Sequence, residues 1–166
     1  MRTFWYTFDM EHTEGKESEK YESNWTRPNL ETERGEVERV IQDFFGKEPN
    51  DQNVQEIVEF LNNSPIIDLI ESDWERLENT DSFHGVRIGH LEDAQKFCEQ
   101  YNEDLDEENK RNFEKLVEGF ESGSQMECPV IVKNHEERLH LVSGNTRLMI
   151  SRALGIRPKV IIGEVS

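Results

Sequence analysis

The feature that most constrains the fold of this chain is a change in the spacing of apolar residues at Gly123. Before Gly123, apolar side chains recur every three or four residues, a spacing typical of amphipathic helices. After Gly123, short apolar runs are separated by turn residues, a pattern typical of strands. The C-terminal part therefore predicts a strand, a hairpin tip, a return strand, a helix closed by glycine, and a last strand: residues 129–133, 134–137, 138–142, 148–154 and 159–162.

The part of the chain before this change predicts helices joined by polar loops. Apolar residues follow helical spacing in five segments: residues 37–45, 54–61, 66–78, 91–101 and 106–121. Gly46 is predicted to stop the first helix, and Asn50 to cap the second. Residues 79–90 predict a loop that contains a short strand at residues 86–88.

The N-terminal end has a different character. Residues 3–8 are aromatic and predict a short strand, whereas residues 9–33 are polar and acidic and predict a loop or partly ordered arm. We therefore divide the chain into an N-terminal strand and acidic arm, a helical region and a hairpin–corner–helix–strand core: residues 1–34, 35–122 and 123–166. The predicted fold class is α+β, with a small mixed sheet formed mainly by the last third of the chain and flanked by helices.

The charge of the chain is strongly negative and unevenly distributed. The formal net charge is −17 at pH 7, yet residues 129–166 hold six basic side chains and three acidic ones. Residues 1–128 therefore carry a net charge of −20. Binding of duplex DNA without regard to sequence needs an extended basic face. We therefore exclude broad duplex binding and expect any phosphate contact in the C-terminal part.

Composition also indicates where the protein acts. No run approaches the roughly 18 apolar residues of a membrane span, and the N-terminal residues lack the long apolar core of a signal peptide. Cys98 and Cys128 form no metal or redox spacing, which favours buried or free thiols in a reducing compartment. His84 and His90 have no third ligand in register, so no metal site is predicted there. We expect a cytoplasmic protein that does not contact membranes.

Residues 143–147, Ser-Gly-Asn-Thr-Arg, form the corner between the return strand and the following helix. Ser143 or Asn145 is predicted to cap this helix, because both side chains accept hydrogen bonds from free backbone amides. Gly144 permits a positive φ and a close backbone approach. Free amides at the positive end of a helix attract anions, and Thr146 and Arg147 add donors suited to phosphate oxygens. The same residues also form an ordinary helix start, so local chemistry leaves a structural role open.

Residues 127–163 resemble the ParB/sulfiredoxin superfamily. The resemblance rests on the strand PVIV, the short hairpin, the corner LVSGNTRL, the helix end ALGI and the closing strand VII. In that family a strand–Gly-x-x-Arg–helix corner receives nucleotide phosphates: ParB proteins bind CTP, sulfiredoxins use ATP, and related small kinases phosphorylate serine or modified DNA bases. Gly144, Asn145, Thr146 and Arg147 match that corner. The resemblance implies that ATP or another nucleoside phosphate binds here, together with Mg²⁺.

The chain departs from the family at two of these positions. Asn145 stands where sulfiredoxins have cysteine, so their sulfinic-acid repair chemistry has no nucleophile here. Thr146 stands where the ParB box has its second arginine, and the sequence shows no basic helix-turn-helix segment. A CTP-driven switch and centromere-type DNA binding are therefore not predicted. The phosphate corner itself is retained.

A phosphoryl-transfer site also requires carboxylates that hold a metal or act as a base. Kinases of the family place theirs upstream of a loop, and by this resemblance the candidate catalytic acids are Asp68, Glu71 and Asp73. Arg147 would neutralise charge on the transferred phosphoryl group. Further candidate contacts with the nucleotide are Ser143 in the corner and three strand residues: Arg138, His140 and Lys159.

Two functions remain open. The first is a nucleotide-dependent phosphotransferase or nucleotide hydrolase, whose phosphate acceptor would be a small molecule or a single modified base. The second is a non-catalytic adaptor, or a mimic of nucleic acid, whose acidic front portion binds a basic protein. The first requires that nucleotides stabilise the protein, whereas the second requires a salt-sensitive complex with a basic partner.

Overall fold

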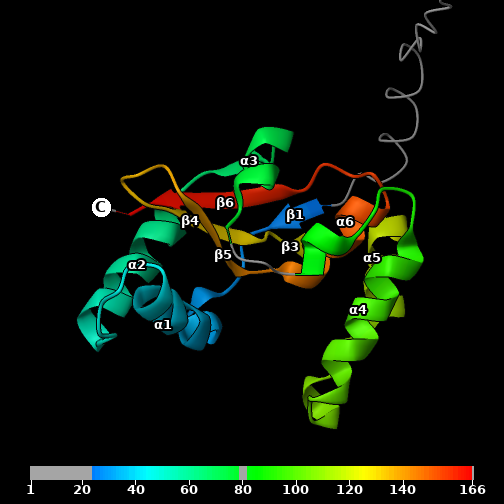
Figure 1. Ribbon diagram of the computed structural model, residues 1–166, viewed down its shortest axis with the longest axis horizontal. Coiled ribbons are helices and arrows are strands. Elements are labelled where there is room, and N and C mark those ends of the chain that lie inside the picture. Colours follow the sequence, from blue (N-terminus) through cyan, green and yellow to red (C-terminus); the bar gives the residue numbers. More distant parts are fainter. Residues whose placement is uncertain (1–23, 79–81, 166) are drawn as a thin grey trace, which may run out of the picture.

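The computed structural model describes residues 24–78 and 82–165. The strand predicted at residues 3–8 and most of the predicted arm lie outside these residues. The described part is a mixed α/β structure with two small sheets, and it confirms the α+β prediction (Figure 1). Within this part no helix is both long enough and apolar enough to cross a membrane.

The larger sheet has four strands in the order β2–β6–β4–β5, where the strands are Ile66–Asp68, Lys159–Glu164, Val130–Lys133 and Leu139–Ser143. β4 and β5 form an antiparallel hairpin, as predicted, and β6 runs parallel to β4. β2 pairs with the outer side of β6 in the antiparallel direction, with Ile67 opposite Val160. The sheet is therefore mixed, and three of its four strands come from the C-terminal part of the chain.

The second sheet joins two segments that the sequence did not mark as strands. β1 (Asn24–Thr26) pairs in parallel with β3 (Gln125–Glu127). The prediction of a loop at residues 24–33 is therefore wrong in two places, because η2 (Leu30–Glu33) is a 3₁₀ helix. Trp25 anchors this region, since its ring lies edge-on to Phe120 at 5.7 Å.

The helices largely follow the predicted segments. The α-helices in chain order are α1 to α6: Arg34–Asp43, Asp51–Asn63, Glu71–Arg76, Leu91–Glu103, Phe113–Ser122 and Asn145–Ala153. Asn50 caps α2 as predicted, and its side chain accepts from the backbone of Asn53 while the Asn53 side chain accepts from the backbone of Asn50. Gly123 ends α5 in the left-handed conformation.

Three predictions between residues 66 and 121 need correction. Residues 66–78 do not form one helix, because residues 66–68 pair with β6 and α3 begins only at Glu71. Residues 86–88 do not form a strand, and the neighbouring segment is instead the 3₁₀ helix η3 (Ser82–Gly85). Residues 106–121 are divided between the 3₁₀ helix η4 (Glu107–Asn109) and α5.

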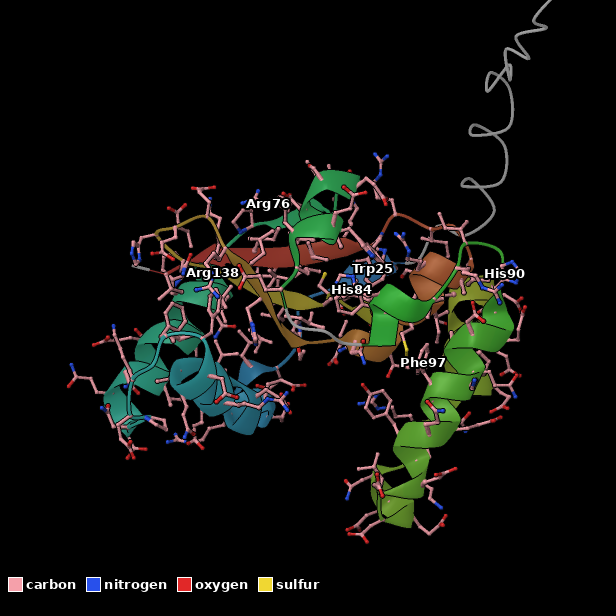
Figure 2. All side chains as sticks on the ribbon, in the orientation of Figure 1. Trp25, Arg76, His84, His90, Phe97 and Arg138 are labelled. Atoms are coloured by element: carbon pink, nitrogen blue, oxygen red, sulfur yellow. The ribbon has the colours of Figure 1, made fainter. Side chains whose placement is uncertain are left out.

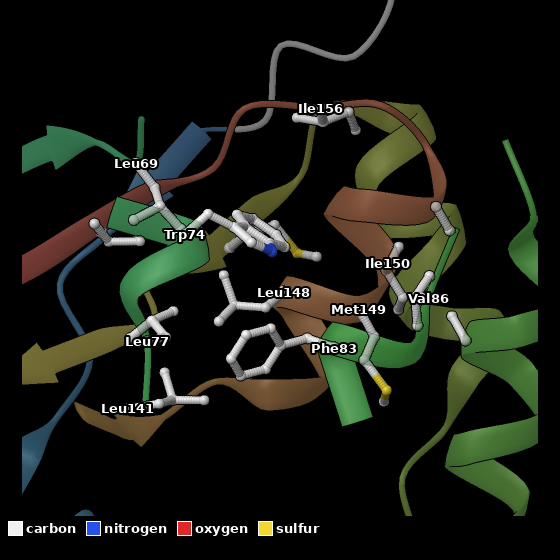
Figure 3. Close-up of a cluster of buried hydrophobic side chains, with 14 of the residues drawn as sticks. Leu69, Trp74, Leu77, Phe83, Val86, Leu141, Leu148, Met149, Ile150 and Ile156 are labelled. Atoms are coloured by element: carbon white, nitrogen blue, oxygen red, sulfur yellow. The ribbon is translucent and has the colours of Figure 1, made fainter. Parts of the chain in front are cut away.

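Apolar side chains cover both faces of the larger sheet. Successive strand residues point to opposite faces, so Val130 and Val132 pack with α1 and α2 while Ile131 packs with α3, η3 and α6. Figure 3 shows part of the apolar cluster on the Ile131 side of the sheet, in which Trp74 and Phe83 lie beside the side chains of α6. The helix α6 that follows the corner is thereby fixed against the sheet and η3.

Candidate functional site

The corner between β5 and α6 has the backbone geometry that the sequence predicts. Gly144 is the residue before α6 and has a φ of 102°, in the left-handed region. A Cβ atom at this position would lie 2.7 Å from the Cα atom of Pro129. Glycine is therefore required both for the turn and for the close approach to the β3–β4 connection.

The predicted helix cap is not formed by Ser143 or Asn145. No side chain caps α6, because Gly144 itself occupies the cap position. The Asn145 side chain instead accepts a hydrogen bond from the backbone N–H of Phe83 at 3.3 Å and donates one to the Tyr101 hydroxyl at 3.3 Å. Asn145 therefore ties the corner to η3 and α4, while the first amides of α6 keep no capping side chain.

The two hydroxyl groups of the corner differ in their surroundings. Ser143 Oγ is buried and has no hydrogen-bond partner among the described residues. Burial raises the pKa of the Cys98 thiol, an effect that nearby Arg111 and a hydrogen bond with the Thr146 side chain only partly oppose. The Thr146 hydroxyl is thus already engaged, whereas Ser143 Oγ stays buried without a partner among the described residues. Cys98 and Cys128 are both free and buried, as predicted.

A cavity of about 330 Å³ adjoins the corner. All five predicted corner residues, 143–147, contribute to its lining. The rest of the lining comes from α1, η2, β5, α5 and the segment just before α5. Its charged members are Glu33, Glu36, Arg39 and Arg111. The volume is at the lower end of the range typical of small-molecule sites.

Three guanidinium groups line this cavity, and they differ in how they are paired. Arg147 is 17% exposed and bonds to Glu127 at 3.0 Å, while Arg39 forms an ion pair with Glu36. Arg111 lies over the Tyr101 ring at 4.3 Å, and its Nη1 atom is buried without a partner among the described residues. The corner cavity is therefore less positive than the predicted phosphate corner, because two of its three arginines already face carboxylates.

Arg111 owes its position to Asn102. The Asn102 side chain accepts from the backbone N–H of Arg111 and donates to its carbonyl oxygen, both at 2.8 Å. These two hydrogen bonds from one side chain fix the backbone between η4 and α5. The arginine side chain is then held over Tyr101, next to the start of α6.

The acidic residues of the cavity are Glu33 and Glu36, neither of which the sequence analysis selected. Burial raises the pKa of Glu33; Arg147 opposes this shift, and Glu36 and Glu127 reinforce it. Glu33 and Arg147 line the same cavity. The signal in the sequence is weak, because both residues lie in an acid-rich stretch where no carboxylate stands out.

We expect Glu33→Gln to raise the free energy of unfolding at pH 7. An acid whose pKa is raised by folding costs stability above its folded pKa, and this cost disappears as the pH falls to the unfolded value. The gain should therefore vanish as the pH is lowered to the ordinary value of 4.5. Urea unfolding across this range measures the effect, with Glu31→Gln on the exposed side of η2 as the control. A gain that persists below that pH contradicts the assignment.

The acids predicted from the family resemblance lie elsewhere. Asp68 bonds to Lys159 at 2.9 Å, and Glu71 bonds to Arg152 at 3.2 Å. Arg152 lies in the last turn of α6, so Glu71 is near the opposite end of the helix from the corner. Asp73 pairs with Arg76 at 3.5 Å. None of the three acids lines the corner cavity.

The candidates on the hairpin are also separated from the corner. Arg138 bonds to Glu78 through Nε at 2.7 Å and lies away from α6 (Figure 2). His140 stacks on Phe44 with ring centroids 4.9 Å apart. Neither residue lines the corner cavity, and nor does Lys159. The described residues also contain no group of three or more His, Cys, Asp or Glu side chains placed to hold a metal.

Comparison with protein-family models, curated proteins and solved structures gives no match. The resemblance to the ParB/sulfiredoxin superfamily therefore stays a prediction from residues 127–163. The site is defined by its own geometry, which combines the corner residues with Glu33, Glu36, Arg39 and Arg111.

Proposed function

We propose that the corner cavity binds the phosphate groups of a nucleotide such as ATP, and that the protein is a nucleotide-dependent phosphotransferase or hydrolase. The observation that carries this proposal is the Arg111 guanidinium, which has a buried, unpartnered N–H in a cavity that also contains the start of α6. A buried donor without an acceptor costs about 1–3 kcal/mol. A phosphate oxygen would satisfy this donor.

Two further groups support phosphate binding at this end of α6. The first amides of a helix point toward its N-terminal end, where the helix dipole favours an anion. Arg147 is held by Glu127, but this carboxylate is 51% exposed. Because only the carboxylate is exposed, a phosphate that enters the cavity can replace it as the partner of the largely buried Arg147.

The carboxylates of the cavity fit a Mg²⁺ ion that arrives with the nucleotide. Mg²⁺ in such sites is commonly held by one or two carboxylates together with substrate phosphates and waters, and Glu33 and Glu36 supply two. The ion would screen the phosphates from these carboxylates and polarise the phosphoryl group. Arg147 would stabilise the negative charge on that group, because its guanidinium is already partly withdrawn from water.

Thermal unfolding with ATP, ADP, CTP or GTP and Mg²⁺ tests the proposal. A ligand at 100 times its Kd stabilises a protein by about 2.7 kcal/mol, which corresponds to a rise in Tm of roughly 5–10 °C for a chain of this size. Arg111→Ala and Arg147→Ala should abolish this rise. Arg138→Ala should keep it, because Arg138 lies outside the cavity.

A second candidate function follows from the far end of α4. This end and η4 project away from the sheets (Figure 1) and carry a group of exposed carboxylates: Glu103, Asp104, Asp106, Glu107 and Glu108. Such a surface suits a basic protein partner. If no nucleotide raises Tm and a basic partner binds with strong salt dependence, the adaptor function replaces the enzymatic one.

A further inference from the structure

A second cavity lies at the opposite end of α6 from the corner. Its volume is about 440 Å³, and its charged residues are Glu71, Arg152 and Arg157. Most of the remaining lining is apolar: Leu69, Trp74, Ile88, Ile156 and Pro158. It shares no residue with the corner cavity, so its role is independent of the proposed nucleotide site.

The cationic groups of this second cavity are only partly compensated. Arg152 bonds to Glu71 at 3.2 Å, and its guanidinium lies 5.2 Å from the centre of the Trp74 ring. Arg157 is exposed and has no ion-pair partner among the described residues. The cavity thus has a net positive charge in a chain whose overall charge is −17. This local reversal of sign favours an anionic ligand.

Trp74 supplies a second polar feature. The side chain is 5% exposed, yet its indole Nε1 has no hydrogen-bond partner among the described residues. Trp74 lines the same cavity as Leu69 and Ile156, and Figure 3 shows its indole nitrogen on the side of Leu148. Buried indole N–H groups normally find an acceptor. Because Trp74 lines the cavity, its indole signal can report on binding there.

The apolar part of the lining indicates the rest of the ligand. Ile88 is 63% exposed at this cavity, although isoleucine is one of the residues most often buried. Leu69, Ile156 and Pro158 also line the cavity, but they are already buried. Contact with an apolar group would remove the exposed Ile88 surface from water, which is worth roughly 25 cal/mol per Å².

We propose that this cavity binds a small organic carboxylate with an aromatic or branched apolar body. The carboxylate pairs with Arg157 and, together with Glu71, shares Arg152. The apolar body covers Ile88 and lies beside the Trp74 side chain. A free phosphate lacks the apolar body, and a neutral hydrophobic molecule leaves Arg157 unpaired.

Titration of the ¹⁵N-labelled full chain, followed by NMR, tests this site. The probe is 1-naphthylacetate, and the readout is the Trp74 indole N–H signal, which Trp74→Phe identifies. The expected result is a saturable shift of this signal. Two controls each lack one part of the probe: naphthylacetamide has the same apolar body without the charge, and acetate has the charge without the body. Each should bind at least about tenfold more weakly than naphthylacetate.

Two variants separate the site from general surface binding. Arg157→Gln should weaken naphthylacetate binding about tenfold without unfolding the protein, because Arg157 is exposed and unpaired. Arg138→Gln should leave the binding unchanged. The proposal is overturned if the indole signal does not move, if the amide binds as tightly as the carboxylate, or if Arg157→Gln has no effect. None of these results bears on nucleotide binding at the corner.

Discussion

Gly144→Ala is expected to lower the free energy of unfolding by about 2–5 kcal/mol. The first cause is backbone strain, since Gly144 has a φ of 102° and alanine in such a conformation costs of order 1–3 kcal/mol. The second cause is a clash, because the new Cβ would lie 2.7 Å from the backbone Cα of Pro129. Urea unfolding monitored by circular dichroism measures the change.

Gly35→Ala is the matched control for this substitution. Gly35 lies in the first turn of α1, and no atom lies within 4 Å of a Cβ built on it. Alanine has a higher helix propensity, so this variant should be unchanged or more stable by up to about 1 kcal/mol. If Gly144→Ala unfolds at the same urea concentration as the unmodified protein, the left-handed corner is not formed as described.

Phe83→Ala is expected to produce a loss of similar or greater size, about 3–5 kcal/mol. Phe83 is completely buried and meets the Trp74 ring edge-on at 6.0 Å. Its removal leaves a cavity beneath η3, and the backbone N–H of Phe83 also bonds to Asn145. The loss is a large share of the 5–15 kcal/mol that stabilises a typical domain, so thermal unfolding detects it readily.

Phe60→Ala provides the comparison at an exposed phenylalanine. Phe60 is 44% exposed on α2, and its removal should cost about 1 kcal/mol or less. Similar losses for the two variants would mean that Phe83 does not occupy the core. A loss confined to Phe83→Ala supports the placement of η3 under the corner.

The three C-terminal strands of the larger sheet and the helix α6 could be predicted because the sequence signals for them are local. The hairpin and the glycine at residue 144 each act within a few residues, and the structure forms β4, β5, α6 and β6 where the apolar pattern places them. β2 escaped prediction because three residues are too few to show a period, and its partner β6 lies about ninety residues away in the sequence. β1 and β3 escaped for the same reason.

The candidate site likewise contains a part that local sequence signals predict and a part that depends on distant contacts. Residues 143–147 are contiguous, so their gathering at one cavity follows from a single turn. Hydrogen bonds with Asn102 position Arg111 at the cavity, and Glu127 in β3 forms an ion pair with Arg147 in α6. The order of residues in the sequence reveals neither contact. The acids Asp68, Glu71 and Asp73 rested on the resemblance, and the structure pairs each of them with a basic residue away from the corner.

The most direct test of phosphate binding at the corner is calorimetric titration of the protein with ATP and with adenosine, both in the presence of Mg²⁺. We predict that ATP binds with one site per chain, that adenosine binds at least tenfold more weakly, and that Arg111→Ala removes the difference between them. If ATP does not bind, or if adenosine binds equally well, the corner is not a phosphate site.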